Sequence, residues 1–237
     1  MRDGTCVRCS FAQSIVLGIA IAVGTWSGAV TAQGGTGTIR GTVSTKAKPA
    51  ATTIKVTSDE RVCGSSVPDE ALIVSATGRV ANAVVLIGGT KGTGAHPTVI
   101  TNRKCAFAPR VQAAAPKSTA TVTSEDDLLH NTHAYDEKDY SLFNIALPKP
   151  GLRINRPIRD AGVVTVKCDV HPWMRGFVIV SDELNAVTTT DGSFEIPDVP
   201  AGSHQVRIWH EGLKAAPKTV TVAPGQTTTV AFVLDKS

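Results

Sequence analysis

Short runs in which apolar and polar residues alternate follow one another along most of the chain. Alternation with a period of two predicts β-strands that bury one face. No segment shows convincing helical spacing of its apolar residues, so long helices are not expected. The pattern predicts an all-β fold, built as a sandwich or a Greek-key barrel. The clearest runs lie within residues 38–58, 72–89, 163–168, 176–182 and 186–237.

The composition favours strands and turns over helices. Of the 237 residues, 5% are aromatic, while Gly, Thr, Val and Ala are abundant. The formal net charge is +4, and the charges are scattered without a basic run. We therefore expect no nucleic-acid partner. The length allows one large domain or two modest ones.

The first 32 residues have the pattern of an export signal. A positively charged start is followed by the apolar stretch 11–24, and small residues at 30–32 precede an expected cut before Gln33. The alternative is an uncleaved membrane anchor. Cleavage is favoured because the stretch is shorter than the ~18–20 apolar residues that a stable span needs. We expect a periplasmic or secreted protein without stable membrane insertion.

Sulfur-containing residues are scarce in the expected mature chain. Three cysteines remain after cleavage, Cys63, Cys105 and Cys168, and Met174 is the single methionine. An odd number of cysteines in an exported protein leaves at least one thiol without a partner in the same chain. One thiol therefore needs an explanation other than an internal disulfide.

The segment CDVHPWMRG at 168–176 combines three side chains that bind metals. Cys168, His171 and Met174 are spaced three apart, so they converge only if the chain turns. A proline and a glycine within the segment favour such a turn. Thiolate, imidazole and thioether together form a soft ligand set that selects copper. Two His with one Cys and a weak axial Met is the composition of a blue-copper site.

The second histidine for such a site is offered by LLHNTHAYD at 128–136. His130 and His133 are three residues apart and face opposite sides of a strand. We therefore expect one of them to bind the metal and the other to lie at the surface.

These two segments resemble the cupredoxins, and most closely their amicyanin-like branch. Segment 168–176 is similar to the family's Cys-x-x-His-Pro-aromatic-Met-Arg-Gly loop, and 130–133 is similar to its His-Asn-x-His. The resemblance covers roughly residues 70 to 182 and implies a Greek-key β-sandwich. It implies that one copper ion, cycling between Cu+ and Cu2+, is bound by His130, Cys168, His171 and Met174.

The resemblance also implies roles for two neighbours of the ligands. Asn131 is expected to tie the two ligand segments together by hydrogen bonds. Trp173 has two interpretations, a core aromatic or part of an apolar docking surface around the exposed edge of His171, and its place in the family's loop favours the second. Residues 124–127 depart from the family, which usually has Asn there, and we expect altered hydrogen bonding near the site.

With Cys168 assigned to the metal, Cys63 and Cys105 remain as an even pair. We expect a disulfide between them; the alternative, a second thiolate metal site, lacks a nearby histidine. Two alternatives stay open for the first site: side chains that serve only the core, and zinc, for which a thioether is a poor ligand. No role is assigned to the isolated His96, His204 and His210.

Residues 186–237 resemble the prealbumin-like β-sandwich modules known as carboxypeptidase regulatory-like domains. The resemblance rests on the runs VTTTDGSF and IPDVPAG and on a Thr-rich closing strand. GTIRGTV at 37–43 looks like the opening strand of the same module, so we hypothesise that the N-terminal strands complete it. The expected ranges are 1–32 for the signal, 33–66 for the N-terminal β segment, 67–182 for the copper domain and 183–237 for the smaller sandwich.

These features predict an exported one-electron carrier, not an enzyme, with an unidentified redox partner protein. No Ser/His/Asp pattern or phosphate-binding loop accompanies the candidate ligands. Two other classes of protein stay open. One is a β-sandwich binding or adhesion module with an incidental or lost copper site, and the other is a copper storage or delivery protein.

Overall fold

The computed structural model describes residues 1, 3–5, 34–49, 52–92 and 97–236. Most of the expected export signal with its cleavage site lies outside these residues, as does His96. Within the described part, strands provide nearly all regular structure, and the single helix, α1 (Glu60–Cys63), has four residues. The expected all-β fold is confirmed. None of the described helical structure is long and apolar enough to cross a membrane.

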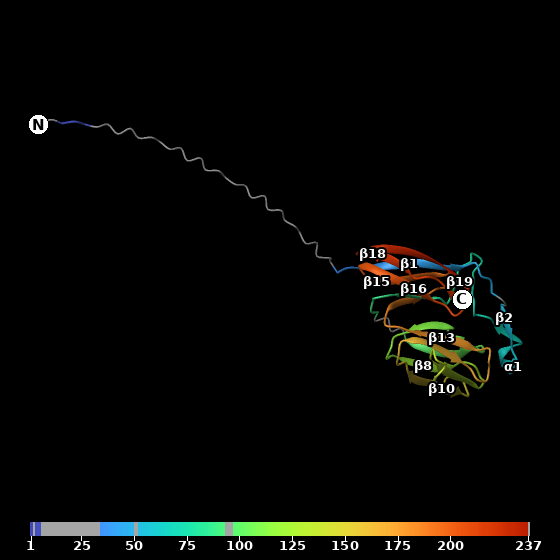
Figure 1. Ribbon diagram of the computed structural model, residues 1–237. Helices are drawn as coiled ribbons and strands as arrows, with labels where there is room; N and C mark the ends of the chain where they lie inside the picture. Colours follow the sequence, from blue (N-terminus) through green and yellow to red (C-terminus); the bar gives the residue numbers. More distant parts are fainter. Residues whose placement is uncertain (2, 6–33, 50–51, 93–96, 237) are drawn as a thin grey trace. The chain divides into compact units, whose positions relative to one another are not determined.

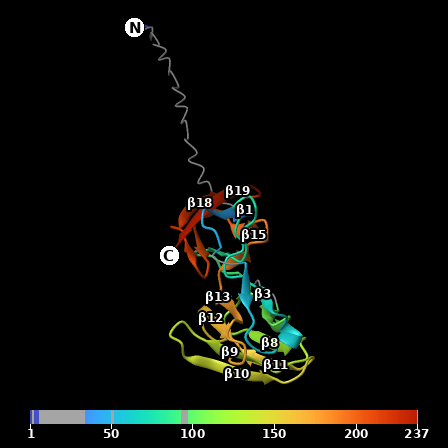
Figure 2. The same cartoon turned by 90° about the vertical axis from the view of Figure 1, so that its right-hand side faces the viewer.

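Nine strands form one β-sandwich, called the first sandwich below. Figure 2 shows its strands β8 to β13 lying together. One sheet has the strand order β10-β9-β12-β13-β7, and the other has the order β11-β8-β5-β6. Apolar side chains such as Val122, Val166 and Val178 are buried in one core cluster of this sandwich, and their burial stabilises it. The strands are β5 (Thr98–Arg103), β6 (Ala106–Ala108), β7 (Val111–Ala114), β8 (Thr119–Ser124), β9 (His130–Tyr135), β10 (Ser141–Leu147), β11 (Arg153–Pro157), β12 (Gly162–Lys167) and β13 (Arg175–Val180).

A second sandwich combines the start of the described chain with its end. In Figure 1, blue β1 lies beside the orange and red strands β15, β18 and β19. Its sheets have the orders β15-β1-β19-β17 and β14-β4-β16-β18, and they bury Ile39, Ile87 and Phe232. The strands are β1 (Thr36–Thr45), β4 (Val84–Ile87), β14 (Leu184–Val187), β15 (Ser193–Pro200), β16 (Gly202–Trp209), β17 (Leu213–Lys214), β18 (Lys218–Val222) and β19 (Thr227–Lys236).

Strand β1 occupies an interior position in its sheet, antiparallel to β15 and parallel to β19. Gly41 makes this position possible. A Cβ atom there would lie 2.0 Å from the carbonyl oxygen of Val230 and 2.5 Å from the ring of Phe194. The N-terminal strand thus completes the sandwich of the C-terminal strands.

The expected domain ranges differ from this arrangement at two places. The sequence places residues 84–87 in the expected copper domain, but β4 pairs with β14 and β16 of the second sandwich. Within 33–66, β1 belongs to the second sandwich, whereas Val56 is buried in the core of the first. Alternation shows that a segment is a strand, but it does not show which of two similar apolar cores will bury it.

A segment between β1 and β4, called the cap segment below, consists of residues 53–68. It contains β2 (Thr53–Lys55), α1 and β3 (Ser66–Pro68), and β2 pairs with β3 in antiparallel fashion. Val56 and Val67 anchor both arms of this ribbon in the first sandwich. Because α1 lies between these two anchors in the chain, it is held next to the first sandwich.

Candidate metal centre

The loop between β12 and β13 carries three of the four expected ligands. Cys168 directly follows β12, and Met174 directly precedes β13. Because Lys167 pairs with Arg175, the loop begins and ends on neighbouring strands. The amide of Met174 donates to the carbonyl of His171 (2.9 Å), which forms the turn that the sequence predicted.

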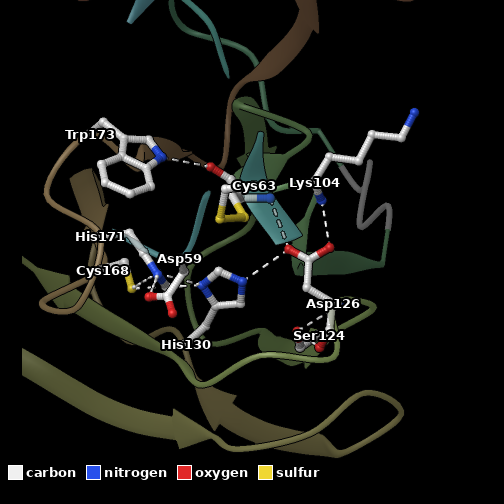
Figure 3. The surroundings of a disulfide bond; sticks show 10 residues. Asp59, Cys63, Lys104, Ser124, Asp126, His130, Cys168, His171 and Trp173 are labelled. Carbon is white, nitrogen blue, oxygen red and sulfur yellow. Dashed lines mark hydrogen bonds and ion pairs between the residues drawn. A yellow bond between two sulfur atoms is a disulfide. The ribbon is translucent and has the colours of Figure 1, made fainter. Parts of the chain in front are cut away.

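His130, Cys168 and His171 converge in one buried cluster (Figure 3). His130 is the first residue of β9. The Nδ1 atoms of the two histidines are 3.0 Å apart, and Sγ of Cys168 lies 3.9 Å from Nδ1 of His130 and 3.6 Å from Nδ1 of His171. The residues are 0%, 3% and 0% exposed in chain order. One ion can contact all three donor atoms.

The outer nitrogens of both imidazoles are already hydrogen-bonded. Nε2 of His130 lies 2.9 Å from the carboxylate of Asp126, and Nε2 of His171 lies 3.1 Å from that of Asp59. Since a carboxylate accepts, each Nε2 carries the proton, and a neutral ring then has a bare Nδ1. Two bare, buried Nδ1 atoms 3.0 Å apart repel each other unless a cation lies between them. This donor arrangement fits a bound metal ion.

The environment of His130 favours the neutral ring that metals bind. Burial lowers the pKa of His130, and the hydrogen bond with Asp126 opposes this shift without reversing it. Metal binding to histidine requires the deprotonated nitrogen. His130 is therefore ready to bind a metal near neutral pH.

Asp126 lies in segment 124–127, where the sequence predicted altered hydrogen bonding. Besides contacting His130, its carboxylate accepts from the amides of Lys104 (2.7 Å) and Cys105 (2.9 Å). These two residues connect β5 to β6 with φ values of 52° and 55°, a region that side chains other than Gly rarely adopt. Asp126 thus stabilises this turn and joins His130 to it.

Asp59 covers the outer edge of His171, so the expectation that this edge is exposed is wrong. The carboxylate of Asp59 occupies that edge, and His171 is 0% exposed. Asp59 precedes α1, whose last residue, Cys63, forms the expected disulfide with Cys105. The pairing of these cysteines is therefore confirmed. The covering of His171 was missed because it depends on a contact across 112 residues of sequence.

Asn131 lies between the two ligand segments. Its Oδ1 accepts from the amide of Asp169 (2.6 Å), and its Nδ2 donates to the carboxylate of Asp169 (2.7 Å). The backbone amide of Asn131 points at Sγ of Cys168 (3.5 Å), and the same sulfur lies 3.4 Å from Oδ1 of Asn131. This is the place that the resemblance implies for Asn131, and its effect on a bound metal stays a prediction.

Met174 and Trp173 belong to the same loop but differ in burial. Met174 is 2% exposed and is buried with the core of the first sandwich. Trp173 is half-buried, its ring centroid is 5.1 Å from that of His171, and its Nε1 donates to the carbonyl of Cys105 (3.1 Å). Trp173 thus links its loop to Cys105 of the disulfide, and its docking role stays a prediction.

His133 faces away from the cluster, as its odd spacing from His130 predicted. Its Nδ1 lies 3.0 Å from the carboxylate of Asp169, and its Nε2 lies 2.9 Å from the hydroxyl of Ser141. Its ring stacks on Tyr135 at 4.2 Å. His133 is half-buried in this polar group and does not lie free at the surface.

A second group of possible metal donors overlaps the first but cannot hold a metal in the same way. Cys105, Asp126 and His130 are close together. The sulfur of Cys105 is bonded to that of Cys63, and a disulfide offers no thiolate. In the part of the chain that the structure describes, Cys168 is the one free cysteine.

Comparison with known proteins gives similarities for both sandwiches. The carboxypeptidase regulatory-like domain model matches residues 157–235. That range begins in the first sandwich, because β12 and β13 contribute Val166 and Val178 to its core. No curated protein matches the chain.

Among solved structures, the chain is similar to several copper proteins over about two fifths of its length. A novel purple cupredoxin from Nitrosopumilus maritimus is 26% identical, covering 35% of this chain and 99% of that chain, with a TM-score of 0.32. A reduced amicyanin variant is 19% identical, covering 41% and 98%, with a TM-score of 0.32. A Cu-containing nitrite reductase from Thermus scotoductus is 21% identical, covering 39% and 24%, with a TM-score of 0.31. The two families that the sequence resembles are thus both found in these comparisons.

Proposed function

We propose that the first sandwich binds a single copper ion and that the protein is an exported one-electron carrier. The ligands are Nδ1 of His130, Sγ of Cys168 and Nδ1 of His171, with Met174 as a weaker fourth ligand. The observation that carries this proposal is the convergence of the three donor atoms, 3.0 to 3.9 Å apart, with both outer imidazole nitrogens bound to carboxylates.

The donor set favours copper over other common metals. A thiolate with two imidazoles suits copper and zinc, whereas magnesium, calcium and manganese prefer oxygen ligands. The buried thioether of Met174, at the end of the same loop, favours copper over zinc. We therefore assign the site to copper.

The surroundings of the donors suit a carrier better than an enzyme. When bound, copper supplies a one-electron change between Cu+ and Cu2+. His130, Cys168 and His171 are almost completely buried, and the carboxylates and Asn131 hold them in place. Fixed ligands keep one geometry in both oxidation states, and their burial leaves little room for a substrate at the ion.

Export is supported by the disulfide. Structural disulfides form and persist in oxidising compartments such as the periplasm and the extracellular space. The bond between Cys63 and Cys105 lies beside the candidate ligand His130. The apolar N-terminal stretch of the sequence is the second support.

The visible absorption spectrum of the copper-loaded protein tests this proposal. We expect one copper per chain, an intense thiolate-to-copper band in the oxidised sample, and reversible loss of that band with a reductant. A colourless sample would contradict the copper site and favour a binding or adhesion module. Colour combined with rapid copper loss to a competing chelator would indicate storage or delivery and contradict the carrier role.

A further inference from the structure

Asp59 has an unusual backbone conformation directly beside the candidate metal ligand His171. Its φ and ψ are 56° and 32°, in the left-handed region that side chains other than Gly rarely adopt. Its side chain is 40% exposed, while the His171 ring that it contacts is 0% exposed. A strained residue held against a functional side chain suggests that the contact itself is useful.

The cap segment fixes Asp59 in this place from both sides. Its carbonyl accepts from the amides of Val62 (2.9 Å) and Cys63 (3.0 Å), which ties it to the turn of α1. Val56, three residues earlier, is fully buried in the first sandwich. On the other side, Cys63 is covalently bonded to Cys105. Asp59 is therefore positioned by a short segment that is anchored at both ends.

Hydrogen bonds and the disulfide connect the surroundings of the two histidines to each other. Asp59 binds the outer nitrogen of His171 and is linked through α1 to the disulfide. On the far side of the disulfide, the amide of Cys105 donates to Asp126, which binds the outer nitrogen of His130. Figure 3 shows the carboxylates of Asp59 and Asp126, the two histidines and the disulfide that make these contacts. The disulfide thus connects the segment that holds the ring of His171 to the turn that holds the ring of His130.

We propose that Asp59 is a positioning residue of the metal centre, which acts through His171 and closes the outer edge of its ring. This inference rests on the proposed copper site. The carboxylate accepts a hydrogen bond from Nε2–H of His171, which keeps the proton on Nε2 and leaves Nδ1 free for the metal. Its negative charge, 3.1 Å from the ring, stabilises the more positive ion and lowers the reduction potential. Its bulk and charge keep soluble redox reagents away from this edge.

The test uses the full-length copper-loaded chain with Asp59→Asn and Asp59→Ala. Asp59→Asn keeps the shape of the side chain but removes its charge, while Asp59→Ala also uncovers the ring. Glu60→Gln is the matched control, because Glu60 is the next residue, is exposed and loses the same charge. The readouts are the reduction potential by voltammetry and the rate of reduction by hydroquinone, a neutral reagent.

We expect Asp59→Asn to keep the copper band and to raise the reduction potential by on the order of 59 mV, a tenfold change in the preference for the reduced ion. Asp59→Ala should in addition be reduced severalfold faster by hydroquinone. The control should match the wild type. If both Asp59 variants match the control in potential and in rate, Asp59 has no such role. A wild-type protein without the copper band would overturn the copper site itself, and this inference with it.

Discussion

The side chains of His130, Cys168 and His171 are placed more closely than their own chemistry favours without a bound cation. Two imidazole nitrogens that both lack a proton face each other at 3.0 Å in a buried site. Burial lowers the pKa of His130, which disfavours the second proton on its ring that would relieve this repulsion. The residues are therefore arranged for a metal ion.

Met174→Leu tests the fourth ligand at this scale. Met174 is 2% exposed, and Leu is similar in volume, so the cost in folding free energy should be under about 1.5 kcal/mol. Because an axial thioether tunes the potential more than it holds the ion, we expect copper to stay bound while the reduction potential rises. Voltammetry and the visible spectrum measure both effects. An unchanged potential together with an unchanged spectrum would mean that Met174 only fills the core.

Segment 168–176 could be read from sequence because its ligands are local. The spacing of Cys168, His171 and Met174 and the proline between them already predict a turn with converging side chains. Asp59 and Asp126 could not be assigned in this way. A carboxylate becomes a partner of a histidine only when folding brings the two together, and Asp59 is separated from His171 by 112 residues.

At the scale of elements, the candidate metal centre is supported by the cap segment and by the turn between β5 and β6. Neither element contributes a donor atom, but each brings a carboxylate or a disulfide cysteine to the histidines. Asp126 accepts from both amides of a turn whose two residues have positive φ. The disulfide joins this turn to α1. These two elements therefore decide how rigidly the rings of His130 and His171 are held.

Replacing both Cys63 and Cys105 with Ser tests the disulfide as a clamp. The bond closes a loop of 42 residues, for which the loss of loop-closure entropy predicts a destabilisation of about 4 kcal/mol. Denaturant unfolding of the wild type and the double variant measures this difference. The copper-loaded double variant should also have a raised reduction potential, because Asp59 is then held less firmly against His171.

The double variant is preferable to a single substitution. In Cys63→Ser the thiol of Cys105 would become free beside Asp126 and His130, where it could compete for the metal. A double variant with wild-type stability and wild-type potential would show that the cap segment is held by its apolar anchors alone. Val56 and Val67 are those anchors.

At the scale of the whole molecule, the two sandwiches share the chain in an interleaved order. The second sandwich takes β1, β4 and the strands from β14 onwards, while the cap segment and the strands from β5 to β13 belong to the first. A small cluster that includes Leu86, Phe177 and Ile179 connects strands of both. Arg110, just before β7, forms a nearly buried ion pair with Glu211, just after β16 (2.8 Å). Sequence patterns identified the two sandwich types but not this interleaving, because strand pairing is decided by packing.

His210 makes the stability of this region dependent on pH. Burial, with a smaller contribution from the charge of Arg110, lowers its pKa to about 4. The unfolded chain therefore takes up this proton at a higher pH than the folded chain. The neutral ring of His210 contributes about 3 kcal/mol to the free energy of unfolding. This contribution is fully present above about pH 6.5 and is lost as the pH falls toward about 4.

We expect His210→Asn to reduce the loss of stability between pH 6.5 and 4, as measured by denaturant unfolding at several pH values. Asn retains an acceptor for the amide of Gly212, which now bonds to Nδ1 of His210 (3.1 Å). His130 contributes a slope of the same sign, since burial lowers its pKa too, so the comparison is between variant and wild type. Equal slopes in the two proteins would show that His210 is not the titrating group.

The most direct test of the proposed copper centre is the visible spectrum of the copper-loaded Cys168→Ser variant beside that of the wild type. Cys168 is the free cysteine of the described chain and lies within 3.9 Å of both Nδ1 atoms. Because the intense band requires a thiolate ligand, we expect it in the oxidised wild type and not in the variant. A band of undiminished intensity in the variant, or none in the copper-loaded wild type, would contradict the metal centre described here.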